Sequence, residues 1–333
     1  MLNLSQTLHG VTVVEIASYI PGPLCAAILA GLGATVIKIE RPGGDPMRSL
    51  PPLDQSGENP LFALLNRSKQ CRTLNLRQDT DVAALRDLLQ SADILIDGMR
   101  PGALARLGLT DESLWQTNPR LLIVAIGGAP THHSHRDKAL HDLNAQALSG
   151  LLAAGEVPPR VPGVHASDMV SGLMAASAIL AGLLARTGTG RGGRIETSML
   201  AAARWLNAPA LAIALAGLSA ADTLNGSFAC YRLYQTADSR FLAVAALEHH
   251  FWQRLCLAID RPDLIPLQYE RAAQPALINT LTAIFRQRSL AEWQTIFDPL
   301  DACVSPVLLP YEAAQDGPVN VELAIVTRSM ASD

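Results

Sequence analysis

The sequence predicts an α/β protein with a large domain built on an open, parallel, Rossmann-like sheet and a smaller α/β domain after it. Apolar, β-branched stretches alternate with helix-compatible stretches over the first part of the chain, which is the pattern of βαβ units. A hairpin pattern followed by helices marks the later part. With 49% hydrophobic and 17% charged residues among 333, the chain can bury the large core that such a fold needs.

The first βαβ unit is expected near the N-terminus. Residues 11–17 (VTVVEIA) are β-branched and bounded by turn residues, so they predict a buried strand. A Pro-Gly-Pro turn then precedes a helix over Leu24–Leu32, which Gly33 is placed to end, and Ala34–Glu40 predicts the second strand. No G-x-G-x-x-G follows the first strand, so the sequence does not support a dinucleotide site there.

The same alternation of strands and helices continues along the chain. Further strands are expected over Cys71–Leu76, Asp93–Asp97 and Leu121–Ile126, with a helix over Asp79–Leu89. The stretch IETSMLAAARWLN predicts a later helix that breaks at Pro209.

These elements divide the chain into domains. We place a large α/β domain at residues 1–200, a linker at 201–227, the small α/β domain at 228–310 and a shortened C-terminal tail at 311–333. The small domain should contain a hairpin formed by Phe228–Tyr234 and Arg240–Ala245, followed by helices.

Charge and cysteine content exclude several classes of protein. A net charge of −4 gives no electrostatic case for binding nucleic acid or an anionic membrane. The five cysteines are scattered and form no C-x-x-C pair, which argues against a disulfide framework or a zinc site. No segment resembles a signal peptide, and the longest uninterrupted apolar run, Gly172–Ala185, is too short to span a bilayer. We therefore expect a cytoplasmic protein.

Two titratable residues each stand at the start of an apolar, helix-compatible run. His141 and Asp142 open the first run, and Ser167 and Asp168 open the second after a Pro/Gly-rich loop. Serine is a good N-cap, and a carboxylate in the first turn suits the helix dipole. Two such groups at the heads of buried helices fit a proton-transfer or acyl-transfer site. The alternative is that Asp168 only caps its helix and His141 only lies on the surface.

Polar and basic residues gather around the strand ends. They are Lys38 and Arg41 at the second strand, Asn66 and Lys69 in a basic turn before the third, and Arg100 after the fourth. Ligands of open α/β sheets bind at the carboxyl ends of the strands, and the Arg100 guanidinium could bind a phosphate in bidentate fashion. The alternative is that these are ordinary charged and polar side chains that contact only solvent.

Several stretches resemble one enzyme superfamily. HDLNAQALSG resembles the Gly-His-Asp-Ile-Asn-Tyr stretch of α-methylacyl-CoA racemases, and residues 166–200 resemble the segment that carries the essential aspartate of family III CoA-transferases. GMRPGALARLGL resembles the family's Phe-Arg-Pro-Gly-x-x-x-x-Leu-Gly-Leu. Residues 10–48 resemble the family's opening, where a strand-end loop holds the adenosine part of CoA. The resemblance extends from residue 8 to about residue 315.

The resemblance implies an acyl-CoA enzyme without a prosthetic group, in which coenzyme A is part of the thioester substrate. It implies catalytic roles for His141, Asp168 and Glu248, the last matching a racemase glutamate associated with the catalytic histidine. The CoA part would be bound by Lys38, Arg41, Asn66, Lys69 and Arg100. It also implies a homodimer of interlocked rings, in which Glu248 reaches the site from the small domain of the other chain.

Two mechanisms share this scaffold. A racemase moves the α-proton of the thioester through an enolate, which backbone N–H groups at the helix start after Asp168 would stabilise. A transferase uses the aspartate as a nucleophile and forms a mixed anhydride, then an aspartyl-CoA thioester. His141 stands where transferases usually carry Tyr, and Ile20 where formyl-CoA transferase has Gln, which favours the racemase. A CoA-binding relative without catalysis is the third alternative.

The loop 129–140 departs from the family pattern. It carries His132, His133 and His135 shortly before His141. Because the H-H-x-H spacing has no cluster of Cys or carboxylates behind it, we expect no metal site. We expect this loop, together with residues after Phe228, to line the pocket for the acyl group.

Overall fold

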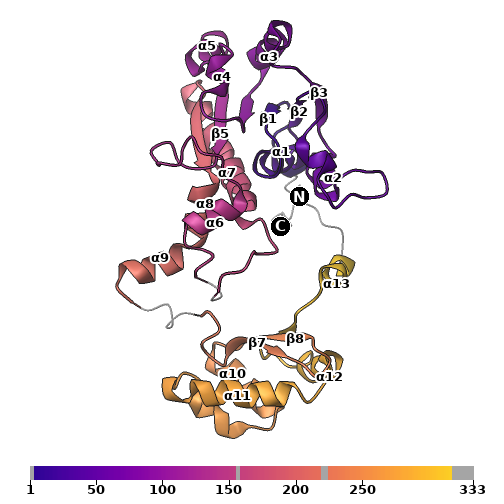
Figure 1. Ribbon diagram of the computed structural model, residues 1–333, viewed down its shortest axis with the longest axis vertical. Helices are drawn as coiled ribbons and strands as arrows, with labels where there is room; N and C mark the ends of the chain where they lie inside the picture. The colour runs from indigo at the N-terminus through magenta and orange to yellow at the C-terminus, as the bar shows by residue number, and fades with distance from the viewer. Residues whose placement is uncertain (1–3, 155–157, 219–223, 317–333) are drawn as a thin grey trace, which may run out of the picture. The chain divides into compact units, whose positions relative to one another are not determined.

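A computed structural model describes residues 4–154, 158–218 and 224–316 (Figure 1). The described residues up to Ala208 form one compact unit, and those from Pro209 form a second. This boundary falls inside the segment 201–227 expected as a linker, where the helices α8 (Met199–Leu206) and α9 (Ala208–Leu215) lie. Residues 219–223 of that segment and 317–333 of the expected tail lie outside the described residues.

The first unit contains a six-stranded parallel sheet with the strand order β3-β2-β1-β4-β5-β6. Its strands are β1 (Thr12–Ile16), β2 (Thr35–Glu40), β3 (Gln70–Thr73), β4 (Ile94–Asp97), β5 (Leu122–Gly127) and β6 (Gly193–Ser198). This confirms the predicted open parallel sheet. The prediction of a helix from Ile195 was wrong at its start, because Ile195–Ser198 belong to β6. That strand lies at the sheet edge and is largely polar, so it lacks the apolar pattern of a buried strand.

Helices cover both faces of this sheet (Figure 1). They are α1 (Pro21–Gly31), α2 (Pro60–Asn66), α3 (Asp79–Ser91), α4 (Ala103–Arg106), α5 (Asp111–Thr117), α6 (Asp142–Leu148) and α7 (Ala166–Thr189), with short 3₁₀ helices at Leu4–Gln6 and Pro46–Ser49. Neighbouring strand residues alternate between the two layers: Val13 packs with side chains of α1 and α7, and Val14 packs with side chains of α3. The central strands β1, β4 and β5 are therefore buried on both faces, as their continuous apolar runs predict, whereas the edge strands β3 and β6 are more exposed.

Helix α7 is longer than the apolar run noted in the sequence. It has 24 residues and is the one described helix that is long and apolar enough to cross a membrane by length and composition alone. It packs closely on α1, where a Cβ atom on Gly172 would lie 2.7 Å from the carbonyl oxygen of Pro21. Only 33% of its most apolar window is buried, however, so much of its apolar surface remains open.

The second unit has a three-stranded antiparallel sheet ordered β7-β8-β9, and its core is rich in aromatic side chains. Its strands are β7 (Tyr231–Gln235), β8 (Phe241–Ala245) and β9 (Val304–Pro306). Its helices include α10 (His249–Ala258), α11 (Gln274–Phe285), α12 (Leu290–Phe297) and α13 (Pro310–Ala313), with 3₁₀ helices at Pro262–Leu267, Arg271–Ala273 and Ala314–Asp316. The strands β7 and β8 form the hairpin predicted from the sequence, and Ser239 adopts a positive φ of 62° in its turn.

The strand order of the large sheet reverses between β1 and β4. In a doubly wound sheet, such a switch point opens a crevice at the carboxyl ends of the two strands. The chain segments that leave β1 and β4 approach each other closely here, because a Cβ atom on Gly98 would lie 2.7 Å from Cβ of Ala17. A larger residue at position 98 would push these two segments apart.

Candidate active site

Three adjoining cavities lie at the carboxyl ends of the parallel strands. The arginine cavity, of about 660 Å³, is lined by Arg41, Arg77, Arg100 and Arg106 among others. The central cavity, of about 310 Å³, is lined by residues that include Tyr19, Arg100, Arg136, His141 and Asp168. The lateral cavity, of about 320 Å³, is lined by residues that include Asp97, Arg136, Arg194 and Glu196. Because Arg100 lines the first two and Arg136 lines the last two, the three cavities adjoin one another in this order.

Asp168 lies in the first turn of α7, and only 8% of the residue is exposed. Its Oδ1 atom is buried and has no hydrogen-bond partner among the described residues. Burial raises the pKa of this carboxyl to about 7, and the negative charge of Asp142 adds to the rise. The group is therefore divided between protonated and ionised forms at neutral pH, which suits a residue that exchanges a proton with a substrate.

His141 immediately precedes α6, and its backbone N–H donates to Oδ1 of Asn144 at 3.1 Å. Its side chain lines the central cavity and meets the ring of Tyr19 edge-on, with ring centroids 5.6 Å apart. The structure thus brings His141 and Asp168 to one cavity from the starts of two different helices. Loop 129–140 also contributes to this cavity and to the lateral one.

Three backbone N–H groups in the first turn of α7, those of Ser167, Asp168 and Met169, already donate to acceptors within the protein, so, contrary to expectation, they do not point free toward an enolate oxygen. Met169 donates to the carbonyl of His165 at 3.0 Å. The backbone N–H groups of Ser167 and Asp168 both donate to Oδ1 of Asp142, at 2.8 and 3.2 Å. An anionic side chain of the protein therefore already occupies the position where a substrate oxyanion would accept these hydrogen bonds. In the sequence Asp142 was noted only as the neighbour of His141, and no residue pattern predicted this contact across the loop.

Glu248 lies in the second unit, where it is exposed and immediately precedes α10. His141 and Asp168 lie in the first unit. The pairing of Glu248 with His141 therefore stays a prediction.

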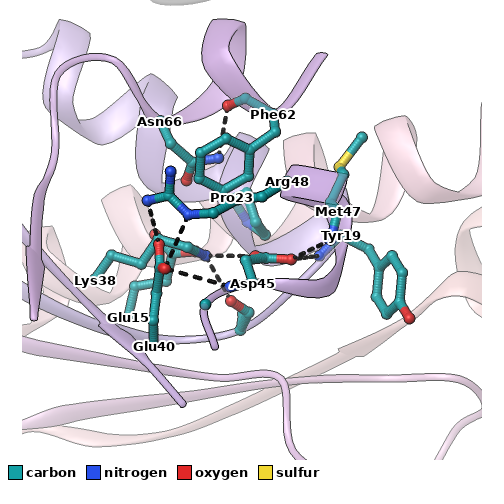
Figure 2. A network of polar contacts seen from close by, with 12 residues as sticks. Glu15, Tyr19, Pro23, Lys38, Glu40, Asp45, Met47, Arg48, Phe62 and Asn66 are labelled. Atoms are coloured by element: carbon teal, nitrogen blue, oxygen red, sulfur yellow. Dashed lines mark hydrogen bonds and ion pairs between the residues drawn. The ribbon is translucent and has the colours of Figure 1, made fainter. Parts of the chain in front are cut away.

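The five residues expected to bind CoA fall into two groups. Arg41 and Arg100 are exposed and line the arginine cavity, where each guanidinium can reach a ligand. Lys38 and Asn66 instead turn inward and use their polar atoms within the protein (Figure 2). Lys69 does the same through its contacts with Glu15, Pro23 and Asn66. The structure does not bring these three side chains to the cavity surface.

The inward-facing residues form a buried network below the arginine cavity. The ammonium of Lys38 is 3.0 Å from Oε1 of Glu15 and 3.0 Å from Oδ2 of Asp45, and donates to the carbonyl of Ala17 at 2.7 Å. Lys69 donates to the other oxygen of Glu15 at 2.8 Å. Both lysine side chains and that of Glu15 have no exposed surface, so every charge here is compensated by protein groups.

This network fixes the loops that border the cavities (Figure 2). Burial alone would lower the pKa of Lys38, but the carboxylates of Glu15 and Asp45 outweigh it and raise that pKa above its ordinary value. Asp45 also accepts a hydrogen bond from the backbone N–H of Met47 at 2.9 Å, which starts the 3₁₀ turn after β2. A second ion pair, from Arg48 to Glu40 at 2.9 Å, holds the same turn. The two lysines therefore support the arginine cavity indirectly: they hold the loops that border it and do not contact its interior.

The lateral cavity also contains polar groups that the sequence did not single out. Burial raises the pKa of Asp97, at the end of β4, to about 6. The hydroxyl of Thr197 is buried and lacks a hydrogen-bond partner among the residues described. Arg194 is paired with Asp111 at 3.0 Å and with Glu196 at 2.7 Å. Across residues 4–154, 158–218 and 224–316, no three His, Cys, Asp or Glu side chains gather in a group that could hold a metal ion.

Comparison with known proteins gives a consistent result. A sequence model of CoA-transferase family III matches residues 8–329. The α-methylacyl-CoA racemase of Homo sapiens is 34% identical over 91% of this chain and 78% of its own length. The succinyl-CoA:mesaconate CoA-transferase of Haloarcula marismortui is 30% identical over 87% of this chain and 76% of its own. The crystal structure of a CAIB/BAIF family protein from Brucella suis matches with a TM-score of 0.81 at 25% identity, covering 93% of this chain and 86% of that one.

Proposed function

Because the chain belongs to CoA-transferase family III, we propose that it is a racemase that interconverts the 2R and 2S forms of a 2-methylacyl-CoA thioester. The observation that carries this proposal is the presence of His141 and Asp168 in one cavity, with the pKa of Asp168 raised to about 7. A racemase needs two groups that can each give and take a proton near neutral pH, and these two residue types meet that need.

In the proposed reaction, one of the two groups removes the α-proton from one face of the thioester. The electron pair of the broken C–H bond passes into an enolate, and the second group delivers a proton to the opposite face of the same carbon. His141 and Asp168 exchange roles when the other epimer is the substrate. Glu248, supplied by a second chain, would orient His141 and increase its basicity.

The series of cavities supports one orientation of the substrate. The arginine cavity, with four guanidinium groups, suits the phosphates of CoA, with Arg41 and Arg100 in direct contact. The thioester would then lie in the central cavity beside His141 and Asp168, and the acyl group would extend toward the lateral cavity. Lys38, Lys69 and Asn66 would serve CoA binding by holding the loops in place.

A CoA-transferase is the second candidate, favoured by the transferases among the relatives and by the free Oδ1 atom of Asp168. In that reaction, the Asp168 carboxylate attacks the thioester carbonyl, the C–S bond breaks to expel CoA thiolate, and a mixed anhydride of Asp168 and the acyl group forms. The thiolate then attacks the aspartyl carbonyl, which releases the first acid and leaves an aspartyl-CoA thioester. A relative that binds CoA without turnover is the remaining alternative, and it would be protected by CoA against thermal unfolding without converting any thioester.

Incubation with 2-methylacyl-CoA thioesters in D₂O tests the proposal. A racemase incorporates one deuterium at the α-carbon and converts either epimer into a mixture, which mass spectrometry and chiral analysis detect. Parallel incubations that include free carboxylic acids test for transfer. New acyl-CoA products without α-deuteration would reject the racemase in favour of the transferase.

We also propose that the protein works as an interlocked homodimer in the cytoplasm. Apolar side chains are exposed along α7 at helical spacing: Leu173 is 50% exposed and Leu184 is 73% exposed. A second copy of the chain would cover this face and supply Glu248. We expect sedimentation to give a dimer at micromolar concentration and Leu184→Asp to weaken it, whereas a folded wild-type monomer would contradict the proposal.

A further inference from the structure

Asp142 connects the two helix starts that carry the proposed proton-transfer residues. It is 7% exposed and directly follows His141 in the chain. Its Oδ1 atom accepts hydrogen bonds from the N–H and the hydroxyl of Ser167, at 2.8 and 2.5 Å, and from the N–H of Asp168 at 3.2 Å. Its Oδ2 atom accepts from Nε2 of Gln146 at 2.6 Å. One carboxylate of α6 therefore caps the first turn of α7.

These contacts determine where Asp168 lies. The backbone N–H of Asp168 is held directly, and the preceding residue, Ser167, is held through two atoms. The first turn of α7 therefore cannot rotate or fray without breaking hydrogen bonds to a charged acceptor, which are stronger than those to a neutral one. Because Asp142 adjoins His141 by a peptide bond, the same contacts fix the separation of His141 and Asp168.

The charge of Asp142 also acts on Asp168. A second carboxylate nearby disfavours ionisation, and together with burial it accounts for the raised pKa of Asp168. The cationic groups that line the same cavity, Arg100, Arg136 and Lys138, are exposed side chains. The His165 ring lies 3.9 Å from Asp142 on the outer side and is 64% exposed. Asp142 is thus the buried charge that acts most directly on Asp168.

We propose that Asp142 is a positioning residue of this site: its carboxylate holds Asp168 toward the central cavity, and its negative charge sets how firmly Asp168 retains a proton. This rests on the acid–base role proposed above for Asp168. Asp142 itself need not touch the substrate, because both of its oxygens are already engaged by α6 and α7.

Two variants separate the charge of Asp142 from its contacts. Asp142→Asn keeps the shape and an acceptor oxygen for the α7 amides but removes the charge, whereas Asp142→Ala removes both. Asp87→Asn is the control, because it removes a negative charge from an exposed position of α3 that lines none of the three cavities. The titration of the Asp168 carboxyl is followed by ¹³C NMR, with its resonance assigned by its loss in Asp168→Asn.

We expect the titration midpoint of the Asp168 carboxyl to fall by about one pH unit in Asp142→Asn. This is a typical size for the pKa shift that a nearby charge causes. The acidic limb of the pH profile for α-proton exchange should move by the same amount. Asp142→Ala should lower kcat for exchange at least tenfold with little change in KM, since only the reacting end is displaced. Asp87→Asn should leave the midpoint and the rate unchanged.

An Asp168 midpoint that does not move in Asp142→Asn would overturn the inference and leave Asp142 as a helix cap. Wild-type protein gives an independent test if that variant fails to fold: a midpoint in the ordinary range of aspartates, near pH 4, would also overturn it. The titration needs no turnover. If no thioester exchanges its α-proton but the midpoint still shifts as expected, the proposed reaction fails while the action of Asp142 on Asp168 stands.

Discussion

The ring of Tyr19 meets the imidazole of His141 edge-on, with the ring centroids 5.6 Å apart. Tyr19 belongs to the segment after β1 that borders both the arginine cavity and the central cavity. It adopts a positive φ of 66°, and its N–H faces Oδ1 of Asp45 at 3.5 Å. A residue at the border of the arginine cavity therefore contacts the imidazole of His141, the residue proposed to move the proton.

We expect Tyr19→Ala to lower kcat for α-proton exchange about threefold to tenfold, since an edge-to-face aromatic contact contributes about 0.5–1.5 kcal/mol. Tyr19→Phe keeps the ring and should retain nearly full activity. Steady-state exchange rates of the two variants provide the comparison. Equal losses in both would show that the hydroxyl, and not the ring contact, is what matters.

Arg100→Ala should weaken CoA binding by about 1.5–3 kcal/mol, the usual range for a charge-assisted hydrogen bond. Turnover at saturating thioester should change little, because the phosphates lie far from the reacting carbon. Calorimetric titration with CoA measures the effect, and Arg191→Ala, an exposed arginine outside the three cavities, is the control. Unaltered affinity in Arg100→Ala would mean that the phosphates bind elsewhere.

The raised pKa of Asp168 makes stability depend on pH. Between its ordinary value near 4 and its folded value of about 7, the folded protein holds a proton that the unfolded chain has lost. Stability from this group is therefore present at low pH and is lost as the pH rises through about 7. Asp168→Asn, which cannot ionise, should raise the free energy of unfolding at pH 8 by up to about 4 kcal/mol.

Urea unfolding at pH 5 and pH 8 measures this difference for Asp168→Asn. The gain should be about 1.4 kcal/mol at pH 5 and about 4 kcal/mol at pH 8, because the unfolded chain loses this proton from about pH 4 upward and the folded protein loses it only near pH 7. A gain of the same size at both values would mean that Asp168 does not titrate between them.

Single variants of His141 and Asp168 distinguish the two candidate mechanisms. In a racemase, removing either residue should abolish interconversion of the epimers, yet each variant should still exchange the α-proton of one epimer with D₂O. The surviving base can remove and return a proton on its own face. In a transferase, Asp168→Ala should destroy activity, His141→Ala should cost far less, and hydroxylamine should trap modified Asp168 in the wild type. Near-normal activity of His141→Ala on any acyl-CoA would contradict the racemase.

The sequence predicted the large sheet because most of its strands are buried on both faces and so consist of continuous apolar runs. Strand β6 was not predicted, because the residues Ile195–Ser198 alternate in exposure at a sheet edge and lead directly into α8. His141 and Asp168 were found because each begins a helix, which a linear pattern reveals. The cap that Asp142 places on α7 depends on how the chain folds back over the intervening loop, and no local pattern encodes that.

The inward orientation of Lys38 could have been inferred from strand geometry. Lys38 lies on the same face of β2 as the buried Val36, and Glu15 lies within the apolar run of β1. The two strands pair in parallel with Glu15 opposite Lys38. Opposite charges that face each other on buried strands form an ion pair with each other. The strand pairing therefore argues against a ligand-binding role for Lys38, although its position near a strand end suggests one. Lys69 gives no such signal, because its partner Glu15 is distant in sequence.

The buried network also limits how this sequence can diverge. Glu15, Asp45, Lys38 and Lys69 comprise two carboxylates and two ammonium groups, so their formal charges cancel. Removing one member leaves another charge buried without compensation, at a cost of about 3–5 kcal/mol. Proteins have only about 5–15 kcal/mol of stability in total. A sequence that has changed at only one of these four positions is therefore expected to fold poorly. Related proteins should keep all four residues or have replaced them together.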